Sequence, residues 1–98
     1  MDKKEIKEKL IDTILELQKE SGEEEKEVTD LTLPEFDLPG FDSYRAVKVT
    51  AKLIFVFKIK LKGMPNLFAV KKSKQIELLN IKQITHRIYK LIKTGKDE

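Results

Sequence analysis

The most constraining feature of this chain is a 20-residue segment, residues 43–62, that contains no Gly, Pro, Asn or Asp: SYRAVKVTAKLIFVFKIKLK. From Val47 to Leu61 its apolar residues alternate with other residues, which is typical of a β-strand. A strand of about 15 residues would extend roughly 50 Å, whereas a domain of about 100 residues has a radius of gyration near 13 Å. A hairpin would need turn residues that the segment lacks. We therefore predict a helix from 43 to about 57, followed by a short extended stretch.

The predicted helix over 43–57 would have Asp42 as its N-cap. One apolar row contains Val49, Leu53 and Phe57, and a neighbouring row contains Tyr44, Val47, Ala51 and Ile54. Its last turn is apolar on all sides. Ile54 or Val56 must therefore contact another segment or form an exposed patch.

Two other segments have the periodicity of amphipathic helices. The first, near residues 3–20, repeats Ile6, Leu10, Ile14 and Leu17, and Gly22 follows it as a C-terminal stop. The last, from 81 to about 93, begins after Asn80 with Gln83 three residues on, which is a capping-box pattern.

The remaining segments connect these helices. We predict a long first loop over 23–42, a short helix within 66–78, and disordered tails at 1–2 and 94–98. The expected fold is one all-α domain over 1–98: an antiparallel four-helix bundle of three main helices and a short one.

Charge and composition exclude several classes of site. Residues 1–43 hold six basic and 14 acidic residues, a net charge of −8, and residues 44–98 hold 14 and three, a net charge of +11. The absence of cysteine excludes disulfides and thiolate metal sites, and a lone histidine, His86, cannot form a His-rich site. The acidic run 23–25 resembles no metal-binding loop and is expected to be solvated. We expect a soluble cytoplasmic monomer without a membrane span.

The sign of the charge changes at a motif around Ser43. Leu38, Gly40, Asp42 and Ser43 precede the predicted helix, and the order is helix, long loop, Gly-x-Asp-Ser, second helix, irregular segment, final helix. Over residues 3–93 this order resembles the acyl and peptidyl carrier proteins. Their Gly-x-Asp-Ser-Leu motif carries 4′-phosphopantetheine on the serine.

The resemblance implies a carrier protein and not an enzyme. It implies that Ser43 is esterified with 4′-phosphopantetheine, that Gly40 and Asp42 shape the attachment turn, and that acyl intermediates of a fatty-acid or polyketide type of pathway are held as thioesters. Its partners would be a phosphopantetheinyl transferase and acyl-transferring or condensing enzymes. The helix N-terminus after Asp42 suits a phosphodiester because its free N–H groups and dipole favour an anion.

The chain departs from the family's pattern in four ways. Tyr44 replaces the usual leucine, Pro39 is an added residue, and Ser43 to Ile81 is a longer interval than in compact carriers. The docking helix is also basic instead of acidic, with Arg45, Lys48 and Lys52 at helical spacing. We therefore expect partners with acidic docking surfaces that contact Tyr44, Arg45, Lys48 and Lys52.

A second hypothesis remains open from the residues alone. The chain could be a small basic binding module of α+β class, with 45–61 as a strand, for nucleic acid or an acidic protein. Nucleic acid is the less expected partner because no recognised nucleic-acid motif accompanies the basic residues.

Overall fold

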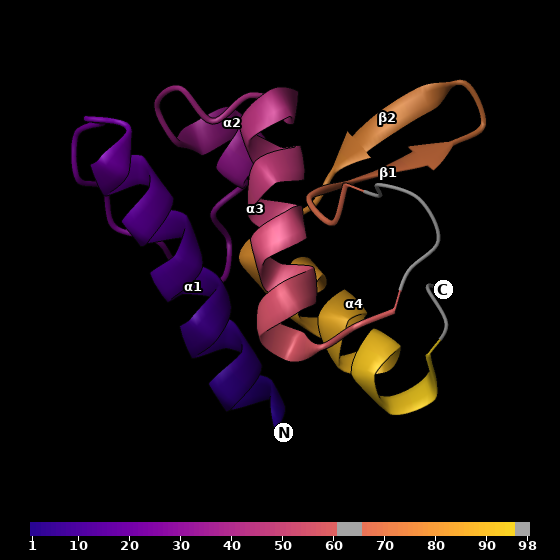
Figure 1. Cartoon of the computed structure of the whole chain (residues 1–98). Helices are drawn as coiled ribbons and strands as arrows, with labels where there is room; N and C mark the ends of the chain where they lie inside the picture. The colour runs from indigo at the N-terminus through magenta and orange to yellow at the C-terminus, as the bar shows by residue number, and fades with distance from the viewer. Residues whose placement is uncertain (61–65, 96–98) are drawn as a thin grey trace.

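The computed structural model describes residues 1–60 and 66–95. Its elements are α1 (Lys3–Glu20), α2 (Pro34–Asp37), α3 (Ser43–Phe57), β1 (Ala69–Lys72), β2 (Gln75–Leu78) and α4 (Ile81–Thr94). Figure 1 shows α1, α3 and α4 packed together, with the β1–β2 hairpin on the side away from α1.

The ends of the three long helices follow local sequence signals. Asp2 accepts a hydrogen bond from the Glu5 N–H, and Asn80 and Gln83 form the predicted capping box at α4. Gly22 has a φ of 74° directly after α1, as a C-terminal stop requires. Asp2 caps α1 and Thr94 ends α4, so these two residues belong to helix ends and not to the expected tails. Residues 96–98 of the expected C-terminal tail lie outside the described residues.

The 43–57 segment is the predicted helix, which ends at Phe57. The strand alternative over 45–61 is therefore wrong for 45–57, and Leu61 lies outside the described residues. Val49, Leu53 and Phe57 are buried as predicted, together with Ala46 and Thr50. The second predicted row is wrong at both Tyr44 and Ala51, which are exposed.

The all-α prediction is wrong because residues 69–78 form a β-hairpin where a short helix was expected. Ala69 pairs with Leu78 and Lys72 with Gln75, so the turn is Ser73–Lys74, with Ser73 at a φ of 55°. A tight hairpin turn needs a positive φ, which Gly, Asn or Asp usually supplies. The short helix is instead α2, inside the first loop, so the fold is mostly helical with one small antiparallel sheet.

The three long helices surround one core, and α1 runs antiparallel to both α3 and α4. Residues near the end of α1 contact the start of α3, and Lys3 at the start of α1 lies over the Tyr89 ring in the second half of α4. The first loop is held against α4, because the Ile81 and Lys82 N–H groups donate to the carbonyls of Thr32 and Asp30. Among residues 1–60 and 66–95, eighteen apolar residues form a single buried cluster, which includes an edge-to-face pair of Phe41 and Phe68.

We predict that Thr50→Val lowers the free energy of unfolding by about 1–3 kcal/mol, because it leaves a buried N–H without an acceptor. The Thr50 hydroxyl accepts from the Leu67 N–H at 3.0 Å and is buried. Thr85→Val is the matched control, since the buried Thr85 hydroxyl only donates to the Ile81 carbonyl of its own helix. The free energy of unfolding is measured in urea. Equal losses in the two variants would contradict this role of the Thr50 hydroxyl.

Candidate attachment site at the start of helix α3

Ser43 is the first residue of α3, and its side chain is exposed. The capping role belongs to Asp42, whose carboxylate accepts from the Arg45 N–H at 2.8 Å and whose carbonyl accepts from the Ala46 N–H at 2.9 Å. Among the described residues, the Ser43 hydroxyl has no hydrogen-bond partner. The serine is therefore not needed to cap the helix.

The backbone amides beside Ser43 are also free. Within residues 1–60 and 66–95, no acceptor binds the N–H of Ser43 or of Tyr44. These groups lie at the positive end of the dipole of a 15-residue helix. An anionic group on the Ser43 oxygen would meet two unpaired donors and a favourable dipole.

A cluster of polar side chains fixes the turn that precedes Ser43. We call it the Arg45 cradle, formed by Gln18, Glu23, Arg45 and the Pro39 carbonyl. The Arg45 Nη1 donates to Gln18 Oε1 at 3.0 Å and to the Pro39 carbonyl at 3.5 Å, and it lies 3.7 Å from Glu23 Oε1. The buried Gln18 also donates to the Pro39 carbonyl at 2.8 Å. The contacts of the cradle connect α1, the first loop and α3.

Gly40 is the residue that the cradle requires. Its φ of 67° favours glycine, and a Cβ there would lie 2.8 Å from Arg45 Nη1 and from both carboxylate oxygens of Glu23. The glycine of the motif thus has two roles, a left-handed turn and room for an ion pair.

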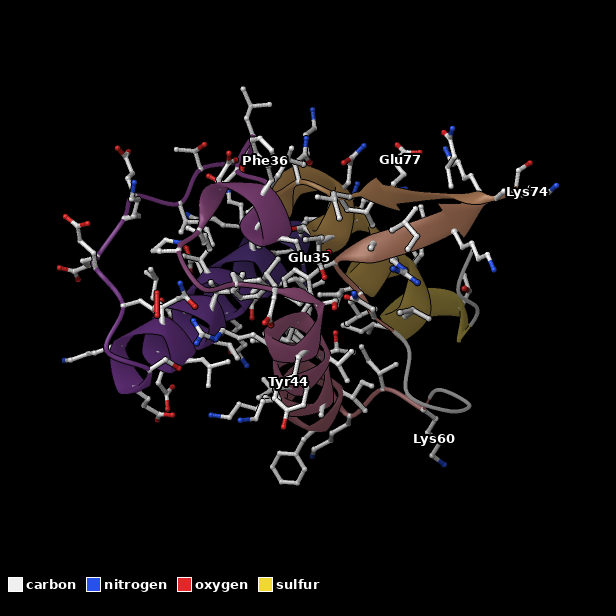
Figure 2. All side chains as sticks on the ribbon, turned by 90° about the horizontal axis from the view of Figure 1, so that it is seen from above. Glu35, Phe36, Tyr44, Lys60, Lys74 and Glu77 are labelled. Atoms are coloured by element: carbon white, nitrogen blue, oxygen red, sulfur yellow. The ribbon has the colours of Figure 1, made fainter. Side chains whose placement is uncertain are left out.

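The predicted docking residues divide into two kinds. The Arg45 side chain is 20% exposed and occupied inside the cradle, so it is not a free docking cation. Tyr44 is 72% exposed, Lys48 lies 5.5 Å from its ring centroid, and Lys52 lies 3.9 Å from Glu20. Figure 2 shows Tyr44 on α3, away from the hairpin.

Most of the exposed residues of α3 form one stripe. We define the α3 stripe as Tyr44, Lys48, Ala51, Lys52 and Phe55, which recur at helical spacing and are all exposed. Phe55 is 84% exposed, and a groove of about 490 Å³ beside it runs between α1 and α3. Phe55 and Val56 form the exposed apolar patch that was expected at the last turn of the helix. Ile54 is half-buried. No acidic residue occurs anywhere in α3.

Sequence reasoning missed part of the site. Glu23 was expected to be solvated with the rest of the acidic run, but it is half-buried against Arg45, while Glu24 and Glu25 are exposed as expected. Gln18 was not singled out at all. It lies 27 residues from Arg45, and nothing in the local pattern marks that pair.

The described part of the chain lacks two other kinds of site. It contains no group of three His, Cys, Asp or Glu side chains placed to hold a metal ion. None of its helices is both long and apolar enough to cross a membrane.

We predict that Gly40→Ala lowers the free energy of unfolding by about 1 kcal/mol more than Gly22→Ala does, since only Gly40 supports the cradle. Gly22 has a similar φ of 74° with nothing within 4 Å of a Cβ, so it reports the backbone strain alone. Equal losses of the free energy of unfolding in the two variants, measured by chemical denaturation, would show that the Glu23–Arg45 pair can move aside without cost.

Comparisons of this chain with protein-family models, with curated proteins and with solved structures find no match. The resemblance to carrier proteins therefore depends on the motif and the order of elements.

Proposed function

We propose that this protein is a carrier that holds acyl groups as thioesters on a 4′-phosphopantetheine arm attached to Ser43. The observation that supports the proposal most directly is the state of Ser43. Its hydroxyl is exposed and unpartnered among the described residues, beside two free N–H groups at a helix start. Asp42 already caps the helix, so a cap alone does not explain the serine.

The chemistry requires little of the carrier itself. The Ser43 oxygen would attack the phosphorus of coenzyme A that bears the pantetheine arm, forming a phosphodiester. The pyrophosphate bond breaks, 3′,5′-ADP leaves, and a base of the transferase takes the hydroxyl proton. The thiol at the end of the arm then accepts an acyl group. On this proposal the protein catalyses no step, and it works in the cytoplasm with the enzymes of a fatty-acid or polyketide type of pathway.

The rival proposal is a basic binding module that uses the α3 stripe without modification of Ser43. Its original form, with 45–57 as a strand, is excluded because these residues are helical. A helical binding module would still bind an acidic partner after loss of the Ser43 hydroxyl, whereas a carrier would not function.

We expect incubation with coenzyme A and a broad-specificity phosphopantetheinyl transferase to add the mass of one phosphopantetheinyl group. Ser43→Ala should abolish the gain, because it removes the attacking oxygen. Ser21→Ala is the matched control, since Ser21 is exposed and lines the same small cleft as Asp42 and Tyr44. Intact-mass spectrometry reads the result. No gain with several transferases, or an unchanged gain in Ser43→Ala, would refute the attachment site.

The partners that fit this carrier have acidic docking surfaces. The stripe beside Ser43 presents two lysines and no carboxylate, so a basic enzyme surface would be repelled and an acidic one attracted. The exposed Phe55 ring supplies an apolar contact at the far end of the stripe.

Lys48→Glu should raise kcat/KM about threefold to tenfold with a transferase that docks through a basic surface, because a repulsion becomes an attraction. The effect should shrink at high salt. Lys74→Glu on the hairpin makes the same charge change away from the stripe and should leave the rate nearly unchanged. Equal effects of the two substitutions would mean that net charge, and not docking, sets the rate.

A further inference from the structure

A second charged feature lies between the N-terminal halves of α1 and α4. A pocket of about 320 Å³ is lined by Lys3, Lys4 and Lys7 from α1, by Lys82 and His86 from α4, and by Asp30 from the loop. Lys3 and Lys7 are one turn apart, as are Lys82 and His86, so each helix contributes one face. The pocket is roughly 20 Å from the cleft beside Ser43, because that cleft is lined by Leu17 at the other end of α1.

The charges in this pocket are poorly balanced. Its lining holds four lysines and one carboxylate. Asp30 pairs with Lys7 at 3.2 Å, and Lys3 lies 5.2 Å from the Tyr89 ring centroid. Lys4 and Lys82 are exposed, and no partner for either is found among the described residues. At least two positive charges therefore remain without a counter-charge.

The positions of these lysines oppose the helix dipoles. Lys3 and Lys4 are the first two residues of α1, whose start also carries Asp2 and Glu5, and Lys82 is the second residue of α4, whose first turn has no acidic side chain. Cations near a helix N-terminus are destabilising. An arrangement that costs stability in the free protein becomes favourable when an anion occupies the pocket.

We propose that this pocket binds a ligand with several phosphate groups. The volume suits a short polyphosphate or a phosphorylated headgroup, and lysines from two helices can contact separate phosphates. The side chains make the contacts, since the Ile81 and Lys82 N–H groups already donate to loop carbonyls. The site does not depend on Ser43 or on the proposed carrier function.

The protein is titrated with inorganic tripolyphosphate at moderate salt, and binding is measured by calorimetry and NMR. We expect saturable binding and a melting temperature raised by about 5 °C or more at saturating tripolyphosphate. The chain has one histidine, so the ring signals of His86 need no assignment and should move on binding. Backbone signals around residues 3–7, 30 and 82–86 should move with them.

The decisive comparison uses two pairs of substitutions with equal charge change. Lys4→Gln/Lys82→Gln should weaken binding about tenfold or more, because it removes the two unpaired cations. Lys71→Gln/Lys74→Gln, at exposed hairpin positions, should change the affinity by less than about twofold. Equal weakening in both pairs, or no saturable binding, would overturn the proposal. Modification of Ser43 is measured separately, so failure of either proposal leaves the other standing.

Vesicles distinguish the source of the phosphate. Vesicles that contain phosphatidylinositol bisphosphate, whose headgroup bears several phosphates, are compared with phosphatidylcholine vesicles in a sedimentation assay. Sedimentation only with the phosphatidylinositol bisphosphate vesicles, lost in Lys4→Gln/Lys82→Gln and competed by tripolyphosphate, identifies a lipid headgroup as the ligand. Tripolyphosphate binding without sedimentation identifies a soluble phosphorylated ligand.

Discussion

The structure depends first on the guanidinium of Arg45. It lies half-covered between the end of α1, the turn at Gly40 and the first turn of α3, and it binds Gln18, Glu23 and the Pro39 carbonyl. The hydrogen bond from Arg45 to Gln18, at 3.0 Å, is charge-assisted, and a bond of this kind contributes about 1.5–3 kcal/mol. The contacts of Arg45 also orient the turn. By fixing the turn before α3, the cradle fixes the direction in which the exposed Ser43 hydroxyl leaves the surface.

The first loop is held at its middle and near its C-terminal end, which explains how 23–42 can be long and still ordered. Its C-terminal end enters the cradle through Pro39, and its middle satisfies the first N–H groups of α4 through Asp30 and Thr32. Within the described residues, two ion pairs, Glu23–Arg45 and Glu20–Lys52, join the acidic half of the chain to the basic half. Few of the 14 basic residues after residue 43 thus pair with acidic residues of the first half. Most of the positive charge lies on the surface.

Features set by neighbouring residues could be predicted from sequence, and features set by distant residues could not. Asp42 and the Asn80–Gln83 pair act within one helical turn, and the length argument favoured a helix over a strand for 43–57. The hairpin was missed because Ser73 and Lys74 are not typical tight-turn residues. The exposed serine was predictable from the motif, whereas the cradle needed Gln18, which no local pattern marks.

The two arginines of the chain share a role that separates them from its lysines. Arg45 donates to the Pro39 carbonyl, and Arg87 donates to the carbonyls of Asn66 and Ala69, where the chain enters the hairpin. A planar guanidinium can serve several acceptors at fixed angles, while an ammonium is a strongly hydrated point charge. Both arginines therefore hold connecting segments in place, and lysines dominate the exposed basic surface. A surface of this kind acts on other molecules through net charge and distance more than through fixed hydrogen-bond geometry, so the partners proposed for the α3 stripe would be selected by electrostatic sign and by the apolar contact at Phe55.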